Sequence, residues 1–157
     1  MKRILLYIGI LAVMLAAPIE RLDVAKLRPV QIVSLEERNN WIIIETDTGD
    51  YGSGATATLA LENMEQTTAG VIYLDTAEYL LLSKDAEDAV QELRSALKPE
   101  TQICYTQGDV PTEQAGKFLS SHGDLPELKD WENGQELPII TAYEERITFL
   151  KKVENNA

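Results

Sequence analysis

Residues 71–106 read VIYLDTAEYLLLSKDAEDAVQELRSALKPETQICYT, and this stretch decides the class of fold. Apolar runs at residues 71–74, 79–82 and 102–106 predict strands, because they are short and contain β-branched and aromatic side chains. Between the last two, residues 85–97 carry apolar positions at helical spacing and end before a proline, which predicts a helix. A strand, a helix and a strand in succession indicate an α/β fold with a partly parallel sheet and right-handed crossovers.

The same alternation continues downstream. Residues 109–121 predict a second helix, and residues 137–142 predict a last strand, which Pro138 places at an edge of the sheet. Residues 143–157 predict a charged, amphipathic helical tail. The connection at residues 75–78 is too short for a crossover helix, so the two strands that flank it are either an antiparallel pair or one interrupted strand.

Upstream, two apolar segments predict an antiparallel hairpin. They are residues 29–35 and 41–46, joined by a loop of about four or five residues that ends Asn-Asn. Three glycines make residues 48–55 a predicted loop, and residues 56–68 then predict a helix. We therefore expect one α/β domain over residues 29–142, with a mixed sheet, the hairpin at its N-terminal side and helices packed on it.

The first nineteen residues have a different character. Lys2 and Arg3 precede an apolar run, and the first acid of the chain is Glu20. A short positive segment followed by an apolar segment is typical of an export signal. We expect residues 1–19 to hold a hydrophobic anchor helix, with residues 4–19 in the lipid bilayer. The body should then lie outside the cytoplasm, because basic residues stay on the cytoplasmic side.

Cleavage of this segment is the alternative. A cleavage site favours small residues in an A-x-A-like pattern, but the segment ends Leu15-Ala16-Ala17-Pro18. We therefore favour a retained anchor in the cell membrane over a protein that is secreted after cleavage near Ala17. Residues 20–28 are charged and short, and we interpret them as a juxtamembrane linker.

The composition excludes several classes of protein. The 157 residues carry 14 Lys and Arg against 26 Asp and Glu, a formal net charge of −12. Nucleic-acid binding needs clustered bases, so no nucleic-acid partner is expected. One Cys and one His exclude an intramolecular disulfide, a Cys-rich zinc site and a His-pair metalloprotease site. We expect no cofactor, and we expect Cys104 to be a buried apolar residue.

The triplet Asp47-Thr48-Gly49 follows one apolar strand, and Asp75-Thr76-Ala77 follows another. Asp-Thr-Gly after an apolar strand resembles the active-site motif of aspartic peptidases, in which two carboxylates share a proton. In that family the two motifs sit in separate lobes or subunits, much farther apart in sequence than these triplets. A peptidase that uses Asp47 and Asp75 is therefore the alternative hypothesis, and the simpler one is that both triplets end strands and cap backbone donors.

The glycine-rich stretch after the hairpin could instead hold a calcium ion or a small ligand. Calcium takes several oxygen ligands, and acids at alternate positions of a loop can supply them. Here a glycine stands at the second such position, and Thr58 stands where a late acid would be needed. The candidate functional residues are Asp47, Thr48, Gly49, Asp50, Gly52, Gly54 and Asp75.

The run from Asp23 to Ser83 has a charged lead, two β segments and a Gly-rich loop, and then continues GATATLALENM from Gly54. This layout resembles the N-terminal domain of spore-germination receptor C subunits. The phrases ETDTGDYGSGATA, LDTAEYLLL and LPII are similar to a family of short, membrane-anchored, uncharacterised proteins of spore-forming Gram-positive bacteria. The C subunits carry an acylated Cys at their mature start, and no Cys follows the apolar segment here until Cys104. The resemblance implies a non-enzymatic envelope protein and transfers no catalytic residue.

These observations predict a non-enzymatic, extracytoplasmic and membrane-anchored domain that works by binding or assembly at the cell or spore envelope, together with a protein partner. The alternatives are the aspartic peptidase and a calcium or small-ligand module in the stretch from Asp47 to Gly54.

Overall fold

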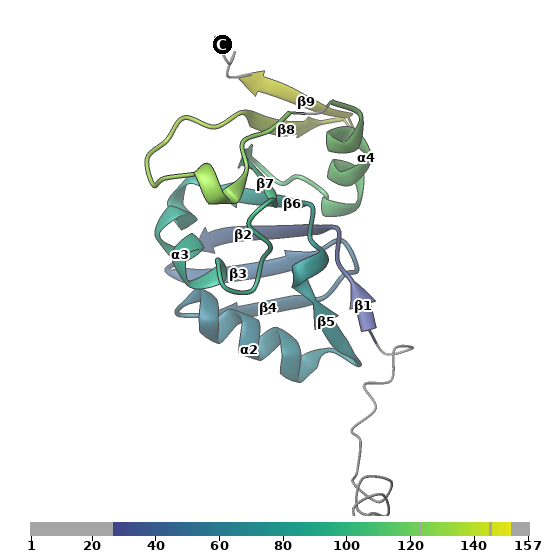
Figure 1. The fold of residues 1–157 in the computed structure, drawn as a ribbon, viewed down its shortest axis with the longest axis vertical. Coiled ribbons are helices and arrows are strands. Elements are labelled where there is room, and N and C mark those ends of the chain that lie inside the picture. The colour runs from purple at the N-terminus through teal and green to yellow at the C-terminus, as the bar shows by residue number, and fades with distance from the viewer. Residues whose placement is uncertain (1–26, 123, 145, 152–157) are drawn as a thin grey trace, which may run out of the picture.

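The computed structural model describes residues 27–122, 124–144 and 146–151 (Figure 1). The expected anchor at residues 1–19 and most of the expected linker lie outside these residues. None of the described helices is both long and apolar enough to cross a membrane.

The described residues form an α/β fold on a seven-stranded mixed sheet, which confirms the predicted class. The strands lie in the order β4-β3-β2-β6-β7-β8-β9. The four central strands β2, β6, β7 and β8 are parallel, whereas β3, β4 and β9 join through antiparallel pairs. The strands are β2 (Ile32–Arg38), β3 (Trp41–Thr46), β4 (Tyr51–Gly54), β6 (Tyr79–Ser83), β7 (Gln102–Gln107), β8 (Ile139–Tyr143) and β9 (Arg146–Lys151).

Helices and short parallel strands complete the described part of the chain. Two short strands, β1 and β5, pair in parallel outside the main sheet. The α-helices α2 and α4 confirm the helices predicted at residues 56–68 and 109–121. The remaining elements are β1 (Leu27–Pro29), β5 (Val71–Tyr73), the α-helices α2 (Ala57–Thr67), α3 (Val90–Leu93) and α4 (Thr112–His122), and the 3-10 helices η2 (Leu74–Thr76), η3 (Lys84–Ala89) and η4 (Leu128–Asp130).

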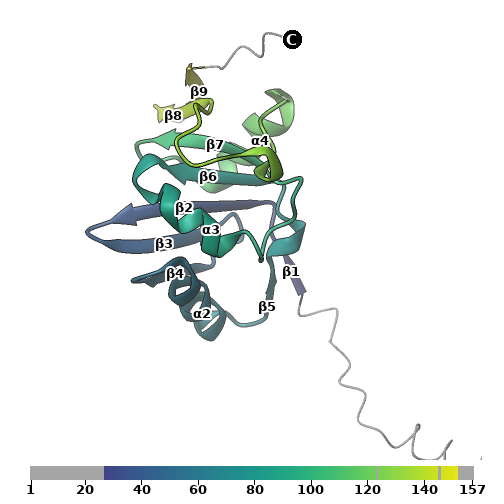
Figure 2. The same cartoon turned by 60° about the vertical axis from the view of Figure 1, so that its left-hand side comes forward.

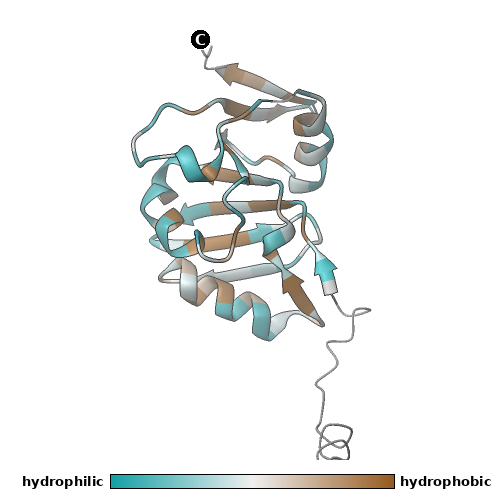
Figure 3. Ribbon diagram, viewed as in Figure 1, coloured by the Kyte–Doolittle hydropathy of each residue, from teal (hydrophilic) through white to brown (hydrophobic). Residues whose placement is uncertain are grey.

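The central strands are buried on both faces. In β6, Leu80 and Leu82 lie in the core on one side of the sheet, and Tyr79 and Leu81 lie in the core on the other. Helices α2 and α3 cover the first side, and Figure 2 shows α3 in front of β2 and β3. Helix α4 covers the second side. Figure 3 shows apolar colour concentrated along these central strands.

The predicted N-terminal hairpin is confirmed, but its loop is shorter than expected. Strand β2 continues to Arg38, which pairs directly with Trp41 of β3. Only Asn39 and Asn40 connect the strands, with φ angles of 55° and 63°. Two successive residues with positive φ suit the right-handed twist of a hairpin, and asparagine tolerates that conformation better than most residues.

The predicted loop at residues 48–55 was wrong at its C-terminal end, because residues 51–54 form β4. Its two glycines are there for packing. A Cβ atom on Gly52 would lie 2.1 Å from the carbonyl oxygen of Ala60, and one on Gly54 would lie 2.5 Å from the Ala60 nitrogen. The backbone of α2 therefore rests directly on β4, which only glycine permits at these positions.

Neither arrangement predicted for residues 71–74 and 79–82 occurs. Strand β5 pairs with β1 in a separate small sheet, while β6 lies between β2 and β7. The linker predicted at residues 20–28 is likewise wrong at its end, since residues 27–28 belong to β1.

The helix predicted at residues 85–97 was wrong in type. Its first part is the 3-10 helix η3, and only α3 is α-helical. The predicted apolar face is nevertheless buried. Ala86 and Ala89 are three residues apart, and so are Val90 and Leu93. Residues at this spacing lie on one face of a 3-10 helix, so the buried face is compatible with 3-10 geometry.

Two predictions near the C-terminus were also wrong. The strand of residues 139–143 is not at an edge, because β9 pairs with it on its outer side, and Pro138 lies just before it. The helix predicted at residues 143–157 is a strand over residues 146–151. Ile147 and Phe149 are two residues apart, which is the side-chain period of one face of a strand. Both pack against the core under α4.

Replacing Gly52 by alanine should destabilise the fold strongly, because the new methyl group can be accommodated only if α2 moves away from β4. We expect the free energy of unfolding to fall by about 3 kcal/mol, the upper part of the range for overpacked sites. Chemical denaturation measures this. Ser53→Ala is the matched control in the same strand, and an equal loss in both variants would contradict the packing argument.

Candidate functional site

Asp47, the first candidate of the sequence, serves the start of strand β2. Its Oδ1 accepts hydrogen bonds from the backbone N–H of Gln31 at 3.1 Å and of Ile32 at 3.2 Å. These are donors just outside the sheet ladder, so the carboxylate caps a strand end. This is the role that the simpler of the two hypotheses gave it.

Asp50 is almost fully buried and is surrounded by donors. Arg28 approaches one carboxylate oxygen through Nη1 at 2.6 Å, and the Thr68 hydroxyl donates to the same oxygen at 3.1 Å. The Thr48 hydroxyl donates to the other oxygen at 2.6 Å. Gly49, with φ of 79°, makes the tight turn that brings Thr48 and Asp50 together.

Asp75 lies exposed in η2. In this triplet it is the Thr76 side chain that forms hydrogen bonds. The Thr76 hydroxyl accepts from the Val30 N–H at 3.0 Å, and its oxygen also lies 2.7 Å from the carbonyl of Tyr73. Within the described residues, no hydrogen bond joins Asp47 to Asp75. No group of three His, Cys, Asp or Glu side chains gathers into a metal site in the same part of the chain.

Taken together, the candidate residues of the 47–54 stretch have structural partners. Asp47 and Asp50 satisfy backbone and side-chain donors, and the glycines admit a turn and a close helix. Cys104 is fully buried, as predicted, and burial raises the pKa of its thiol to about 12.

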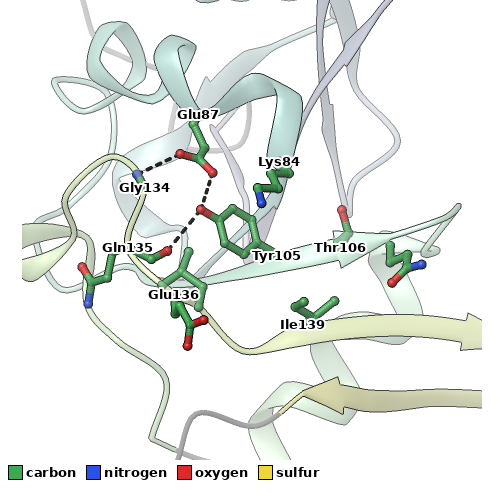
Figure 4. Close-up of a pocket in the computed structure, with 10 residues that line it drawn as sticks. Lys84, Glu87, Tyr105, Thr106, Gly134, Gln135, Glu136 and Ile139 are labelled. Carbon is green, nitrogen blue, oxygen red and sulfur yellow. Dashed lines mark hydrogen bonds between the residues drawn. The ribbon is translucent and has the colours of Figure 1, made fainter.

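A pocket that the sequence did not predict lies between η3, β7 and the chain before β8 (Figure 4). Its volume is about 470 Å³, within the usual range for small-molecule sites. Lys84 and Glu87 come from η3, and three residues come from the C-terminal half of β7. The lining residues are Lys84, Glu87, Tyr105, Thr106, Gln107, Gly134, Gln135, Glu136, Leu137 and Ile139.

The polar centre of this pocket is the pair Tyr105 and Glu87. The Tyr105 hydroxyl lies 2.5 Å from Glu87 Oε1 and 3.3 Å from the carbonyl oxygen of Gln135, and Gly134 donates its N–H to Glu87 Oε2 at 2.9 Å. Figure 4 shows these bonds between η3 and the opposite chain segment. Burial, reinforced by the Glu87 carboxylate, raises the pKa of Tyr105 above its usual range.

Residues 131–137, which we call the strap, close one side of the pocket. Asn133 donates to Asp88 at 2.7 Å, and Arg94 donates to the carbonyl oxygen of Trp131 and stacks over its indole ring. The buried indole nitrogen of Trp131 has no partner in good hydrogen-bond geometry. It lies near enough to the phenol to oppose part of the rise in the Tyr105 pKa. The strap is thus held to η3 and α3 by polar groups of both.

No protein-family model, characterised protein or solved structure matches this chain.

The sequence predicted a strand that contains Tyr105. Because side chains alternate along a strand, it also indicated that Tyr105 and Ile103 lie on the same face of the sheet. Nothing local pointed to its partners, however. Glu87 belongs to the segment predicted as a helix over residues 85–97, and Gln135 lies just before the predicted last strand. The pocket is made by tertiary contacts between segments about 18 and 30 residues from Tyr105.

Tyr105→Phe should change the stability of the protein at alkaline pH. The raised pKa keeps the folded phenol neutral, so its stabilising contribution is complete below about pH 10 and is lost as the pH rises through the folded-state pKa. Between about pH 10 and 12 the wild type should therefore lose up to about 1.4 kcal/mol per pH unit that the variant does not lose. Denaturation at several pH values measures this, with Tyr73→Phe, an exposed tyrosine, as control. Parallel curves for wild type and Tyr105→Phe would contradict the expectation.

Proposed function

We propose that this chain is a non-enzymatic, membrane-anchored binding domain whose ligand occupies the pocket between η3, β7 and the strap. One observation carries the proposal: a cavity of about 470 Å³ in which apolar side chains and charged groups of both signs converge. The polar groups of the pocket come from three separate elements, so the fold holds them in fixed relative positions.

The lining suggests the chemistry of the ligand. Lys84 is the only basic residue that lines the pocket, and Glu87 and Glu136 are the acidic ones. Leu137 and Ile139 supply an apolar surface beside them. A small zwitterion with an apolar body, such as a free aliphatic amino acid, would place its carboxylate near Lys84 and its ammonium group near the acidic side. We propose this class of ligand.

A binding role without catalysis is supported by where the reactive groups lie. Asp47, which the peptidase hypothesis needs together with Asp75, already accepts two backbone hydrogen bonds. Asp50, which the calcium hypothesis needs, accepts hydrogen bonds from two threonine hydroxyls. Cys104 is buried, and its raised pKa disfavours the nucleophilic thiolate. The peptidase and calcium hypotheses gain no support from these contacts.

We further propose that the domain lies outside the cytoplasm at the cell or spore envelope, held by residues 4–19. The apolar N-terminal run behind Lys2 and Arg3 supports this, and so does the resemblance to envelope proteins of spore-forming bacteria.

A protease added to intact protoplasts that produce the full chain should cleave the described domain, because an extracytoplasmic domain is accessible from outside. Immunoblotting against the domain measures the loss, and a cytoplasmic marker protein checks that the protoplasts stay closed. If the domain survives until the membrane is permeabilised, the orientation is wrong.

L-leucine is the probe for the pocket, with 4-methylpentanoate and 3-methylbutylamine as analogues that each lack one of its two charges. We expect leucine to raise the thermal unfolding midpoint of the full chain in detergent more than either analogue, because only the zwitterion satisfies both sides of the pocket. A ligand at about 100 times its Kd stabilises a protein by about 2.7 kcal/mol.

The matched variants are Lys84→Gln and Lys117→Gln, the second an exposed lysine on α4 on the other side of the sheet. Lys84→Gln should abolish the shift with leucine, and Lys117→Gln should leave it unchanged. The proposed ligand class fails if leucine produces no shift, or if both variants respond like the wild type.

A further inference from the structure

Helices cover the second side of the sheet only in part. Helix α4 lies over β6, β7 and β8 on that side and reaches β2, where Gly116 lies close to Ile32. Among the described residues, the buried cluster on this side includes none from β3 or β4. Figure 1 shows α4 beside β7 and β8 and away from β3 and β4. The part of this side formed by β3, β4 and the end of β2 is therefore left uncovered by the described helices.

Large apolar side chains lie on this uncovered part. Ile42 and Ile44 lie in the core on the first side, so the alternate residues of β3 face the second side. Tyr51 of β4 pairs directly with one of them and shares its side. Tryptophan and tyrosine are enriched at protein interfaces, and here both are about half exposed on one face of a regular sheet. The residues of β3 on this side are Trp41, Ile43 and Glu45.

The same surface is acidic. Glu36 and Arg38 of β2 lie opposite β3 residues that face this side, and the two form an ion pair at 2.9 Å. Glu45 and Asp109 form no ion pair within the described part of the chain. Partial burial and the nearby carboxylates of Glu36 and Asp109 raise the pKa of Glu45, so the three acids lie close together. We call this surface the open face, and its residues are Glu36, Arg38, Trp41, Ile43, Glu45, Tyr51 and Asp109.

A hollow of about 300 Å³ adjoins the open face at the carboxyl ends of β2, β6 and β7. Its lining includes Glu36 and Asp109 of the open face, together with Glu37 and the base Arg38. The hollow is large enough for one long side chain, and its excess of acids favours a basic one. The occupant of the open face should therefore carry lysine or arginine.

The backbone of the occupant needs hydrogen bonds of its own. At the adjacent sheet edge, β4 is shielded by α2, and the Asn63 side chain accepts the N–H of Ser53 at 3.2 Å, so this edge does not invite a further strand. An extended chain lying flat on apolar side chains would bury unpaired backbone groups. A helix pairs its own backbone groups, and helices already cover the rest of this sheet.

Charge decides between the possible occupants. A second copy docked through the same face would oppose like charges, and an anionic lipid surface would be repelled by the acids. A helix that carries bases beside an apolar stripe complements both the acids and the aromatic groups. Along β3, Trp41 and Glu45 are four residues or about 13 Å apart, so the apolar and basic residues of the helix should lie roughly two turns apart.

We propose that the open face binds a basic amphipathic helix of a partner protein. The apolar stripe of this helix covers Trp41 and Ile43, and its basic residues meet the acids of the open face and enter the hollow. The pocket described above lies on the first side of the sheet, where Tyr105 belongs to the core under α2 and α3. The proposal is therefore independent of the ligand proposed for that pocket.

Quenching of tryptophan fluorescence by acrylamide tests the open face directly. The chain has two tryptophans, of which Trp131 is buried, so the quencher reports on Trp41. The probe is an alanine-based helical peptide of about 16 residues without tryptophan, in which a leucine stripe ends in arginines. Added to the full chain in phosphatidylcholine nanodiscs, it should protect Trp41 from quenching. Empty nanodiscs measure how much peptide the lipid takes up.

Two control peptides separate the two parts of the interaction. One has glutamate in place of arginine, and the other has serine in place of leucine. Neither should protect Trp41, because the first is repelled by the acids and the second has no apolar stripe to cover the indole.

Glu45→Gln/Asp109→Asn should weaken binding of the arginine peptide roughly tenfold, because two opposite-charge contacts are lost. Glu62→Gln/Glu65→Gln is the matched control. It removes the same charge from exposed positions of α2 on the first side, and it should bind like the wild type. Circular dichroism checks that both double variants keep the fold.

The proposal is overturned if the arginine peptide does not protect Trp41, or if both double variants bind it equally. Protection by nanodiscs that contain phosphatidylglycerol, without any peptide, would assign the open face to a lipid surface instead. Protection that rises with the concentration of the chain alone would assign it to a second copy. Either of these results also overturns the proposal.

Discussion

The start of strand β2 is the junction on which the rest of the structure depends. Strand β2 pairs antiparallel with β3 and parallel with β6, so the two halves of the mixed sheet meet at it. Backbone N–H groups at the start of a strand need hydrogen-bond partners, and here side chains supply them. Asp47 accepts the N–H groups of Gln31 and Ile32, and Thr76 accepts that of Val30. The Gln31 carbonyl oxygen in turn accepts from the N–H groups of Glu78 and Tyr79. The two Asp-Thr triplets, which resembled a catalytic motif, thus hold the hairpin and the parallel strands together.

The sequence predicted those elements whose pattern is set by their own residues. The hairpin, α2, α4 and the strand of residues 102–107 have apolar positions at the period of the element they form, and each was found close to its predicted bounds. The elements that failed depend on a neighbour. Residues 51–54 become a strand because α2 can lie directly on Gly52 and Gly54, and glycine carries no strand signal of its own. Residues 146–151 become a strand because β8 offers an edge beside them, whereas their charges favoured a terminal helix.

The pocket could not be predicted for a related reason. Tyr105, Glu87 and Gln135 are joined only by the folded chain, and each lies in a segment that is ordinary on its own. The stretch from Asp47 to Gly54 differs from the pocket residues, because its acids and glycines form a local pattern that suggested a functional site. In the structure these residues form turns and caps that the fold requires. Local sequence signals therefore located structural roles here, while the candidate site arises from contacts distant in sequence.

Strand β8 lies between the pocket and the edge strand β9. Its first residue, Ile139, lines the pocket and pairs with Tyr105 of β7 on one side and with Lys151 of β9 on the other. The register between β8 and β9 shifts at this residue, so the bulge lies where the pocket ends and the open edge begins. Bulges bend a strand and increase its local twist. The N-terminal half of the described chain, by contrast, has its glycines and buried acids engaged in packing and capping. The pocket lies away from those glycines and acids, because it is lined by η3, the C-terminal half of β7 and the chain before β8.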